Sequence, residues 1–117
     1  SSLCSNQALM ALVASMYLSS VGPDGLAEVA QNSLDLAHYF ETELENLGFI
    51  KKYKSEFFHE FVMSHPTLSS SKIEEHCHKH QILSGLALNE QDILWCVTEA
   101  SQKAQLDEVI NHLKELL

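Results

Sequence analysis

The sequence predicts an α+β domain in which a small antiparallel sheet is covered by helices on one face. Two observations carry this prediction. Apolar residues recur at steps of three and four over residues 24–47 and near the end of the chain, which indicates amphipathic helices. Residues 49–63 and 93–98 instead have the composition and spacing of strands. The expected order is helix, helix, strand, strand, helix, strand, helix, which suggests one layer of helices on one sheet.

The first stretch, residues 5–18 (SNQALMALVASMYL), predicts a helix with Ser5 as its N-cap. The helix would be apolar on all sides, which indicates burial on more than one side. It is too short to span a bilayer, which takes about 20 apolar residues. We therefore expect residues 1–22 to form a buried connecting helix, either in the core of this domain or between it and a larger body. The chain opens on a helix cap without an initiator Met, which suggests a piece of a longer protein.

Residues 23–117 are expected to form a small C-terminal α+β domain. Residues 22–24 (GPD) end the first helix and start the second, because Gly suits a helix end and Pro suits a first turn. The second helix should run from about residue 24 to residue 47. Its apolar stripe comprises Leu26, Ala30, Leu34, Ala37, Phe40, Leu44 and Leu47.

The middle of the chain predicts a hairpin followed by a helix. Residues 49–53 and 57–63 should be two strands that pair antiparallel. Ser71 followed by Glu74 has the spacing of a capping box and predicts the start of a helix. This helix should lie on the surface, because its apolar positions are sparse, chiefly Ile73 and Cys77.

The last third predicts one central strand and one amphipathic helix. Residues 82–88 are expected to be a loop or an edge strand, whereas residues 93–98 are apolar on both faces and should form a central, covered strand. Ser101 should cap the last helix. The apolar stripe of that helix is Leu106, Val109, Ile110, Leu113 and Leu117.

Composition excludes some classes of partner. The formal net charge is −9, and all seven basic residues are Lys, so the chain has no Arg to clamp phosphates or carboxylates. An acidic chain of this kind would be repelled by a nucleic-acid backbone, and no stretch is long enough for a membrane span. Three Cys without a CxxC pair predict reduced thiols and a cytoplasmic location.

One cluster could bind a metal ion. His76 and His80 are four residues apart, so they would share one face of a helix and could hold an ion such as zinc. The zinc-protease pattern needs Glu after the first His, and Cys77 stands there instead. A solvated helix face is the simpler interpretation, and a metal-binding or sensor domain is the alternative.

No catalytic set is predicted. The chain lacks the Gly-rich phosphate-binding motifs and any isolated apolar Lys that could form a Schiff base. His59 shares a strand face with Phe61 and is expected to be hydrogen-bonded or half-exposed rather than catalytic. On these grounds alone the domain has no self-contained active site.

Five short segments lie in the same order as in one enzyme family. They are residues 4–9 (CSNQAL), 22–26 (GPDGL), 37–39 (AHY), 58–62 (FHEFV) and 96–99 (CVTE). They resemble the SNICTNQAL, GPEGL-like, KAHY, FNEFV and CVTE segments of the P-protein of the glycine cleavage system, glycine dehydrogenase (decarboxylating) subunit 1. The resemblance covers essentially the whole chain and identifies it as a C-terminal domain fragment.

The resemblance implies a fold like the C-terminal small domain of aspartate-aminotransferase-like enzymes that use pyridoxal phosphate. It implies glycine decarboxylation with transfer of the aminomethyl group to the lipoyl arm of the H-protein. Pyridoxal phosphate would be bound mainly by glycine dehydrogenase subunit 2, and this fragment would carry no catalytic or cofactor-binding residue. Ser5, Asn6 and Gln7 are candidates for the subunit boundary, with a helix cap and first turn as the simpler role. The small domain of another pyridoxal enzyme is a further alternative.

Overall fold

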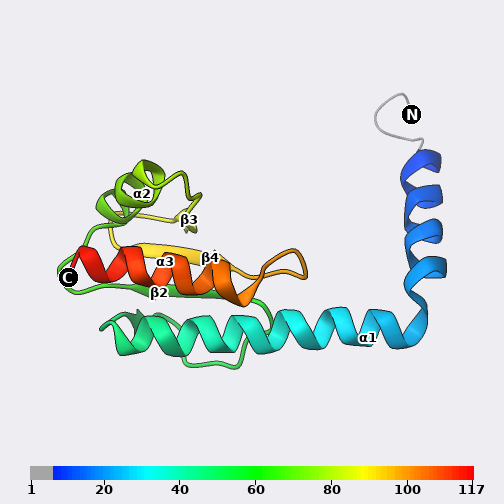
Figure 1. Ribbon diagram of the computed structural model, residues 1–117, viewed down its shortest axis with the longest axis horizontal. Helices are drawn as coiled ribbons and strands as arrows, with labels where there is room; N and C mark the ends of the chain where they lie inside the picture. The colour runs from blue at the N-terminus through cyan, green and yellow to red at the C-terminus, as the bar shows by residue number, and fades with distance from the viewer. Residues whose placement is uncertain (1–6) are drawn as a thin grey trace. The chain divides into compact units, whose positions relative to one another are not determined.

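The computed structural model describes residues 7–117, and these fall into two compact units that divide between Gln31 and Asn32. The second unit contains the sheet and the hydrophobic core (Figure 1). The predicted N-cap Ser5 lies outside the described residues, as do Cys4 and Asn6. Among the helices of the described part, none is both long and apolar enough to cross a membrane.

Helix α1 (Ala8–Asn46) is interrupted at Gly22, where the predicted break between two helices lies. Gly22 has φ 66° and ψ −179°, a left-handed backbone conformation that glycine adopts at little cost. Pro23 follows directly, and a proline at the start of a helical run loses no hydrogen bond. The prediction that residues 22–24 separate two helices is therefore confirmed.

The second unit carries a four-stranded antiparallel sheet in the order β1-β2-β4-β3. Its strands are β1 (Ile50–Lys51), β2 (Glu60–Ser64), β3 (Leu86–Ala87) and β4 (Asp92–Cys96). The predicted hairpin is β1 paired with β2, and the predicted edge strand is β3. β4 lies between β2 and β3, so its central position is confirmed.

The helices pack on one face of this sheet, which confirms the predicted fold class. The core combines residues of α1, both central strands, α2 (Ser70–Lys79) and α3 (Lys103–Glu115). These are chiefly Phe40, Leu44, Phe61, Met63, Ile73, Cys77, Ile93, Trp95, Ile110 and Leu113.

The prediction that β4 is covered on both faces was wrong. Ile93 and Trp95 are 1% and 5% exposed, whereas Leu94 is half-buried and Cys96 is exposed. Successive side chains of a strand point to opposite faces, and helices cover only one of them. The apolar residues on the second face therefore line a surface that this unit leaves open.

Helix α2 begins two residues earlier than predicted. Ser69 is its N-cap and its hydroxyl accepts a hydrogen bond from the amide of Lys72, so the predicted box of Ser71 and Glu74 was wrong. The position of this helix start is set by hydrogen bonds to a segment distant in the sequence. The Ser70 hydroxyl donates to the carbonyl of Asn89 at 2.6 Å, and the Ser70 amide donates to the carbonyl of Glu90 at 2.8 Å. The turn before β4 thus fixes where α2 starts.

The start of α3 also differs from the prediction by one residue. Gln102 is the N-cap and forms a reciprocal capping box with Gln105, a role that sequence reasoning gave to Ser101. The hydroxyl of Ser101 instead accepts from the amide of Thr98 at 3.2 Å. Ser101 therefore stabilises the loop that follows β4 rather than the helix.

Candidate functional site

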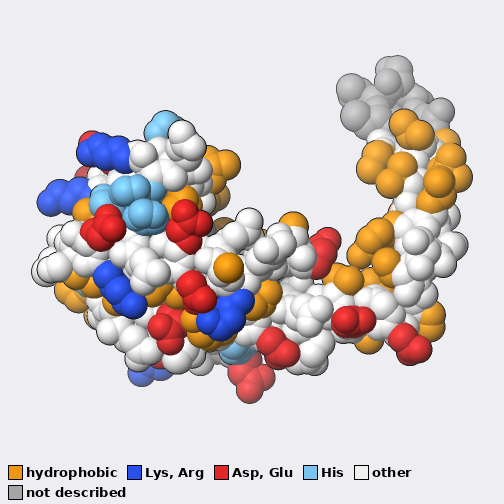
Figure 2. Space-filling model, in the orientation of Figure 1, with side chains coloured by type: hydrophobic (Ala, Val, Ile, Leu, Met, Phe, Trp, Pro, Cys, Tyr) orange, Lys and Arg blue, Asp and Glu red, His pale blue; other side chains and the backbone are white. Residues whose placement is uncertain are grey.

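The most unusual surface of the chain is the first helical run of α1, residues 8–21. Its apolar side chains are solvent-exposed, and Figure 2 shows hydrophobic atoms along the run. Leu9 is 71% exposed, Leu12 56% and Met16 64%. Exposed contiguous apolar surface on a soluble protein commonly marks an interaction site. This run is therefore a candidate interface.

Two of the three boundary candidates, Ser5 and Asn6, lie outside the described residues. The third, Gln7, is exposed, and its carbonyl accepts a hydrogen bond from the amide of Ala11 at 2.9 Å. Gln7 thus takes part in the first turn of the helix, which is the simpler role expected for it. Its role at a subunit boundary stays a prediction.

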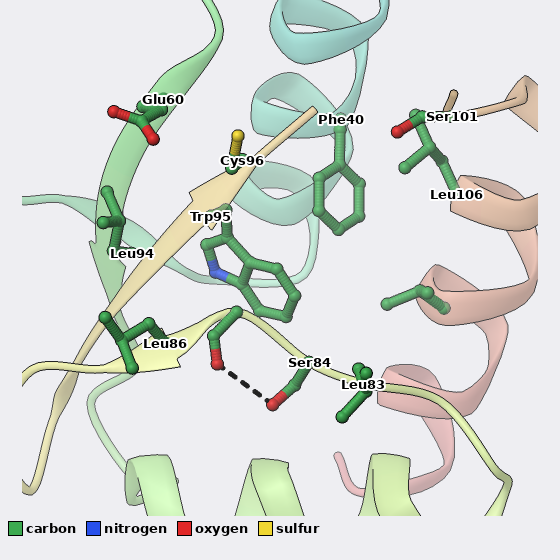
Figure 3. A pocket seen from close by; sticks show the side chains of 12 residues that line it. Phe40, Glu60, Leu83, Ser84, Leu86, Leu94, Trp95, Cys96, Ser101 and Leu106 are labelled. Atoms are coloured by element: carbon green, nitrogen blue, oxygen red, sulfur yellow. Dashed lines mark hydrogen bonds between the residues drawn. The ribbon is translucent and has the colours of Figure 1, made fainter. Parts of the chain in front are cut away.

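A hollow of about 420 Å³ lies beside Trp95 in the second unit. Figure 3 shows Phe40 next to Trp95, and their ring centroids are 5.2 Å apart at 89°. Leu106 of α3 lines it from another side, and the Ser84 hydroxyl donates to the carbonyl of Gly85 at 3.2 Å. Sequence reasoning missed this hollow because its lining comes from separate helices, strands and loops.

The thiol at this hollow is not an activated nucleophile. Although Cys96 is largely exposed, partial desolvation of its thiol, followed by the neighbouring carboxylate of Glu60, raises the pKa of Cys96 above the usual value for cysteine. Because the thiolate is the reactive form of cysteine, a raised pKa lowers its reactivity at neutral pH. Burial also raises the pKa of the Cys77 thiol in the core.

Four of the seven lysines are placed unlike a Schiff-base lysine. Such a lysine needs a lowered pKa in an apolar pocket. Lys103 has its pKa raised well above the usual value by hydrogen bonds with Tyr39 and Asp107. Three further lysines form ion pairs, namely Lys51 with Glu41, Lys52 with Asp92 and Lys79 with Glu75.

The predicted pair His76 and His80 does lie together, with ring centroids 4.9 Å apart, although α2 ends at Lys79 and His80 is its C-cap. The structure adds two side chains that the sequence reasoning missed, His112 and Glu115 of α3. The ligand atoms of all four lie within 4.8 Å of one another. The spacing of three between His112 and Glu115 is a sequence signal for one shared helix face, but its meeting with α2 is a tertiary result.

His59 is half-buried, and its ring packs edge-on against Phe58 with centroids 4.8 Å apart. Its Nδ1 atom is buried and has no hydrogen-bond partner among the described residues. Of the two alternatives expected for His59, a half-exposed side chain is what the structure shows. A hydrogen bond at Nδ1 is not.

Comparison with known proteins decides the family. A family model described as glycine cleavage system P-protein matches residues 1–113. The chain belongs to the glycine cleavage system P-protein family. Proteins from Chlorobium luteolum and Thermotoga maritima, each named probable glycine dehydrogenase (decarboxylating) subunit 1, are 42% and 38% identical over 120 residues. These alignments cover 99% and 97% of this chain but only 27% of each relative.

A solved P-protein has the same fold. The crystal structure of glycine decarboxylase (P-protein) of the glycine cleavage system, in inhibitor-bound form, matches with a TM-score of 0.86 at 29% identity. The match covers 100% of this chain and 28% of that one. A NifS-like protein matches 80% of this chain with a TM-score of 0.67 at 15% identity, a likeness of fold alone. The P-protein matches favour that family over a metal-sensor domain or the small domain of a different pyridoxal enzyme.

Proposed function

We propose that this chain is the C-terminal domain of a glycine dehydrogenase (decarboxylating) subunit 1 and supplies structure and a subunit interface to glycine decarboxylation. The observation that carries the proposal is the exposed apolar run at residues 8–21. A helix that is apolar all round needs cover on several sides. The larger body expected to cover it is the rest of the P-protein assembly, since the chain spans about a quarter of its curated relatives.

We infer that this chain is not the main binding site of pyridoxal phosphate. Four of its lysines form ion pairs, and the whole sequence contains no Arg to clamp a phosphate or carboxylate. In the proposed assembly the cofactor is therefore held mainly by glycine dehydrogenase subunit 2. The lipoyl H-protein receives the aminomethyl group, and the assembly is a cytoplasmic hetero-oligomer.

The interface is tested by placing charge on the apolar run. In the intact protein, Leu12→Asp combined with Met16→Asp should weaken association with glycine dehydrogenase subunit 2 and lower glycine decarboxylation. Burial of a carboxylate without a partner in an apolar interface is strongly unfavourable. Ser19→Asp adds a charge at an exposed polar position of the same run and is the matched control.

Association is measured by analytical ultracentrifugation, and activity by release of carbon dioxide from glycine in the presence of H-protein. Equal association of the double variant and the unchanged protein would remove residues 8–21 from the interface. A separate result would contradict the cofactor assignment: a borohydride-reducible imine with pyridoxal phosphate on a lysine of this chain.

A further inference from the structure

Four potential metal ligands from two helices meet in the second unit. His76 lies in α2 and His80 is the C-cap residue that follows it, whereas His112 and Glu115 come from α3. Figure 2 shows histidine side chains gathered at α2 and α3 with acidic side chains beside them. The family assignment does not use this cluster, which lies outside the interface run proposed above, residues 8–21.

The distances match those between ligands of a tetrahedral ion. The Oε2 atom of Glu115 is 3.5 Å from His76 Nε2, 3.6 Å from His80 Nε2 and 3.5 Å from His112 Nδ1. Zinc bonds to nitrogen and oxygen are about 2.0–2.1 Å long, which places the ligand atoms of a tetrahedral site about 3.3–3.4 Å apart. Three of the six ligand separations therefore need to shorten by only a few tenths of an ångström.

The donor chemistry selects a class of ion. Imidazole nitrogen with one carboxylate oxygen suits Zn²⁺ and its first-row neighbours, whereas Ca²⁺ and Mg²⁺ prefer oxygen ligands alone. Exposure decreases from Glu115, whose side chain is 55% exposed, to His76 at 18%. An ion can thus enter from the solvent side and reach the inner ligand.

Binding requires one existing hydrogen bond to break. The Nε2 atom of His76 lies 2.9 Å from the carbonyl oxygen of His112 and donates a hydrogen bond to it. A metal ligand must present a lone pair, so the ring proton of His76 moves to Nδ1 when Nε2 binds an ion. His80 and His112, stacked with centroids 3.8 Å apart, must also separate slightly.

We propose that His76, His80, His112 and Glu115 form a four-ligand Zn²⁺ site that clips α2 to α3. Four protein ligands leave no open position, which is typical of a structural rather than a catalytic zinc site. The site extends the predicted pair His76 and His80 by the two ligands from α3. Its role is to stabilise the packing of two helices on the sheet.

The test is a titration of the metal-free intact protein with Zn²⁺ against a chromophoric chelator. We expect one ion per chain with a dissociation constant tighter than about 50 nM, the weak end of the range for structural zinc sites. Co²⁺ substitution should give the intense visible absorption of a tetrahedral centre. Bound Zn²⁺ should also raise the unfolding temperature, because an ion that binds only the folded state stabilises it.

His80→Gln and Glu115→Gln should each weaken Zn²⁺ binding by more than about tenfold, the loss seen when even a hydrogen-bond partner of a ligand is removed. Both residues are exposed, so the variants should stay folded, which circular dichroism checks. His78→Gln is the matched control, an exposed histidine on the same helix outside the cluster. Adventitious capture, with weak binding or equal losses in all three variants, would overturn the proposal, as would an octahedral Co²⁺ spectrum.

Discussion

The first helical run of α1, residues 8–21, differs from α3 in where its apolar residues lie. In α3, Leu106, Ile110 and Leu113 form one stripe, and all three are buried. In residues 8–21 apolar side chains surround the helix, and they remain exposed. An amphipathic helix can bury its single stripe within one small unit, whereas a helix apolar on all sides needs more cover than its own unit, residues 7–31, provides.

The largest expected effect compares one leucine from each helix. Leu113 is fully buried, so Leu113→Ala should lower the free energy of unfolding of the 117-residue chain by about 2–5 kcal/mol through lost burial and a cavity. Leu12 is 56% exposed, and Leu12→Ala should change it by less than about 0.5 kcal/mol. Urea unfolding measures both. If Leu12→Ala lowered the free energy of unfolding as much as Leu113→Ala does, the two helices would not differ as proposed.

Two glycines give a smaller contrast between packed and open backbone. A Cβ at Gly85 would lie 2.4 Å from the carbonyl oxygen of Leu94, so Gly85→Ala should cost about 1–3 kcal/mol through overpacking. A Cβ at Gly22 would meet no atom within 4 Å, so Gly22→Ala should cost only the strain of φ 66° with ψ −179°, a combination essentially limited to glycine, about 1–3 kcal/mol. Thermal unfolding measures the stability of both variants. If Gly85→Ala left the unfolding temperature unchanged, the backbone at the sheet edge would be able to shift and accommodate the added methyl group.

A pH effect is expected in the second unit but not in residues 8–21, which contain no carboxylate. Hydrogen bonds from Asn89 and Lys52 hold the pKa of Asp92 below its usual value. Because the folded pKa lies below the unfolded one, this stabilisation is present above about pH 3.9, the usual value, and is lost as pH falls through the folded pKa.

Asp92→Asn should therefore reduce stability at neutral pH and weaken its dependence on acid. The measurement is the free energy of unfolding across the acid range. An acid dependence identical to that of the unchanged chain would show that other carboxylates dominate. Gln91→Glu, at the exposed neighbouring position, is a control that adds a carboxylate without these partners.

The smallest expected effect concerns the start of α2. Ser69→Ala removes the hydroxyl that accepts from the Lys72 amide and should cost about 1 kcal/mol. Ser71→Ala, at the position that the sequence favoured, should cost clearly less because its hydroxyl bonds only that of Ser69. Chemical denaturation of both variants ranks them. The reverse order would restore Ser71 as the cap.

Local patterns predicted most of the elements of the fold. The break at Gly22, the hairpin of β1 and β2, the edge strand and the apolar stripe of α3 all follow from spacing and turn residues over a few positions. The misplaced cap of α3 came from a local bond between Ser101 and Thr98, but the error at α2 arose where a distant segment intervenes. Ser69 caps α2 because the turn at Asn89 and Glu90 holds Ser70, and no local pattern contains that contact.

The candidate sites also have parts that local sequence patterns predicted and parts that they did not. The apolar character of residues 8–21 and the pair His76 and His80 were visible in the sequence, as was the absence of Arg. The hollow beside Trp95 and the addition of His112 and Glu115 were not, since each joins residues far apart along the chain. Sequence spacing places side chains on a face of one helix, but not opposite the face of another.

By itself the sequence determined which helices are amphipathic, which stretches form strands and the resemblance to the P-protein family, because these depend on residues close together in the chain. The tertiary structure decided which face of β4 is covered, where α2 begins and which side chains join His76 and His80. These depend on how helices pack across the sheet, where one segment provides hydrogen-bond partners, cover and possible metal ligands to another.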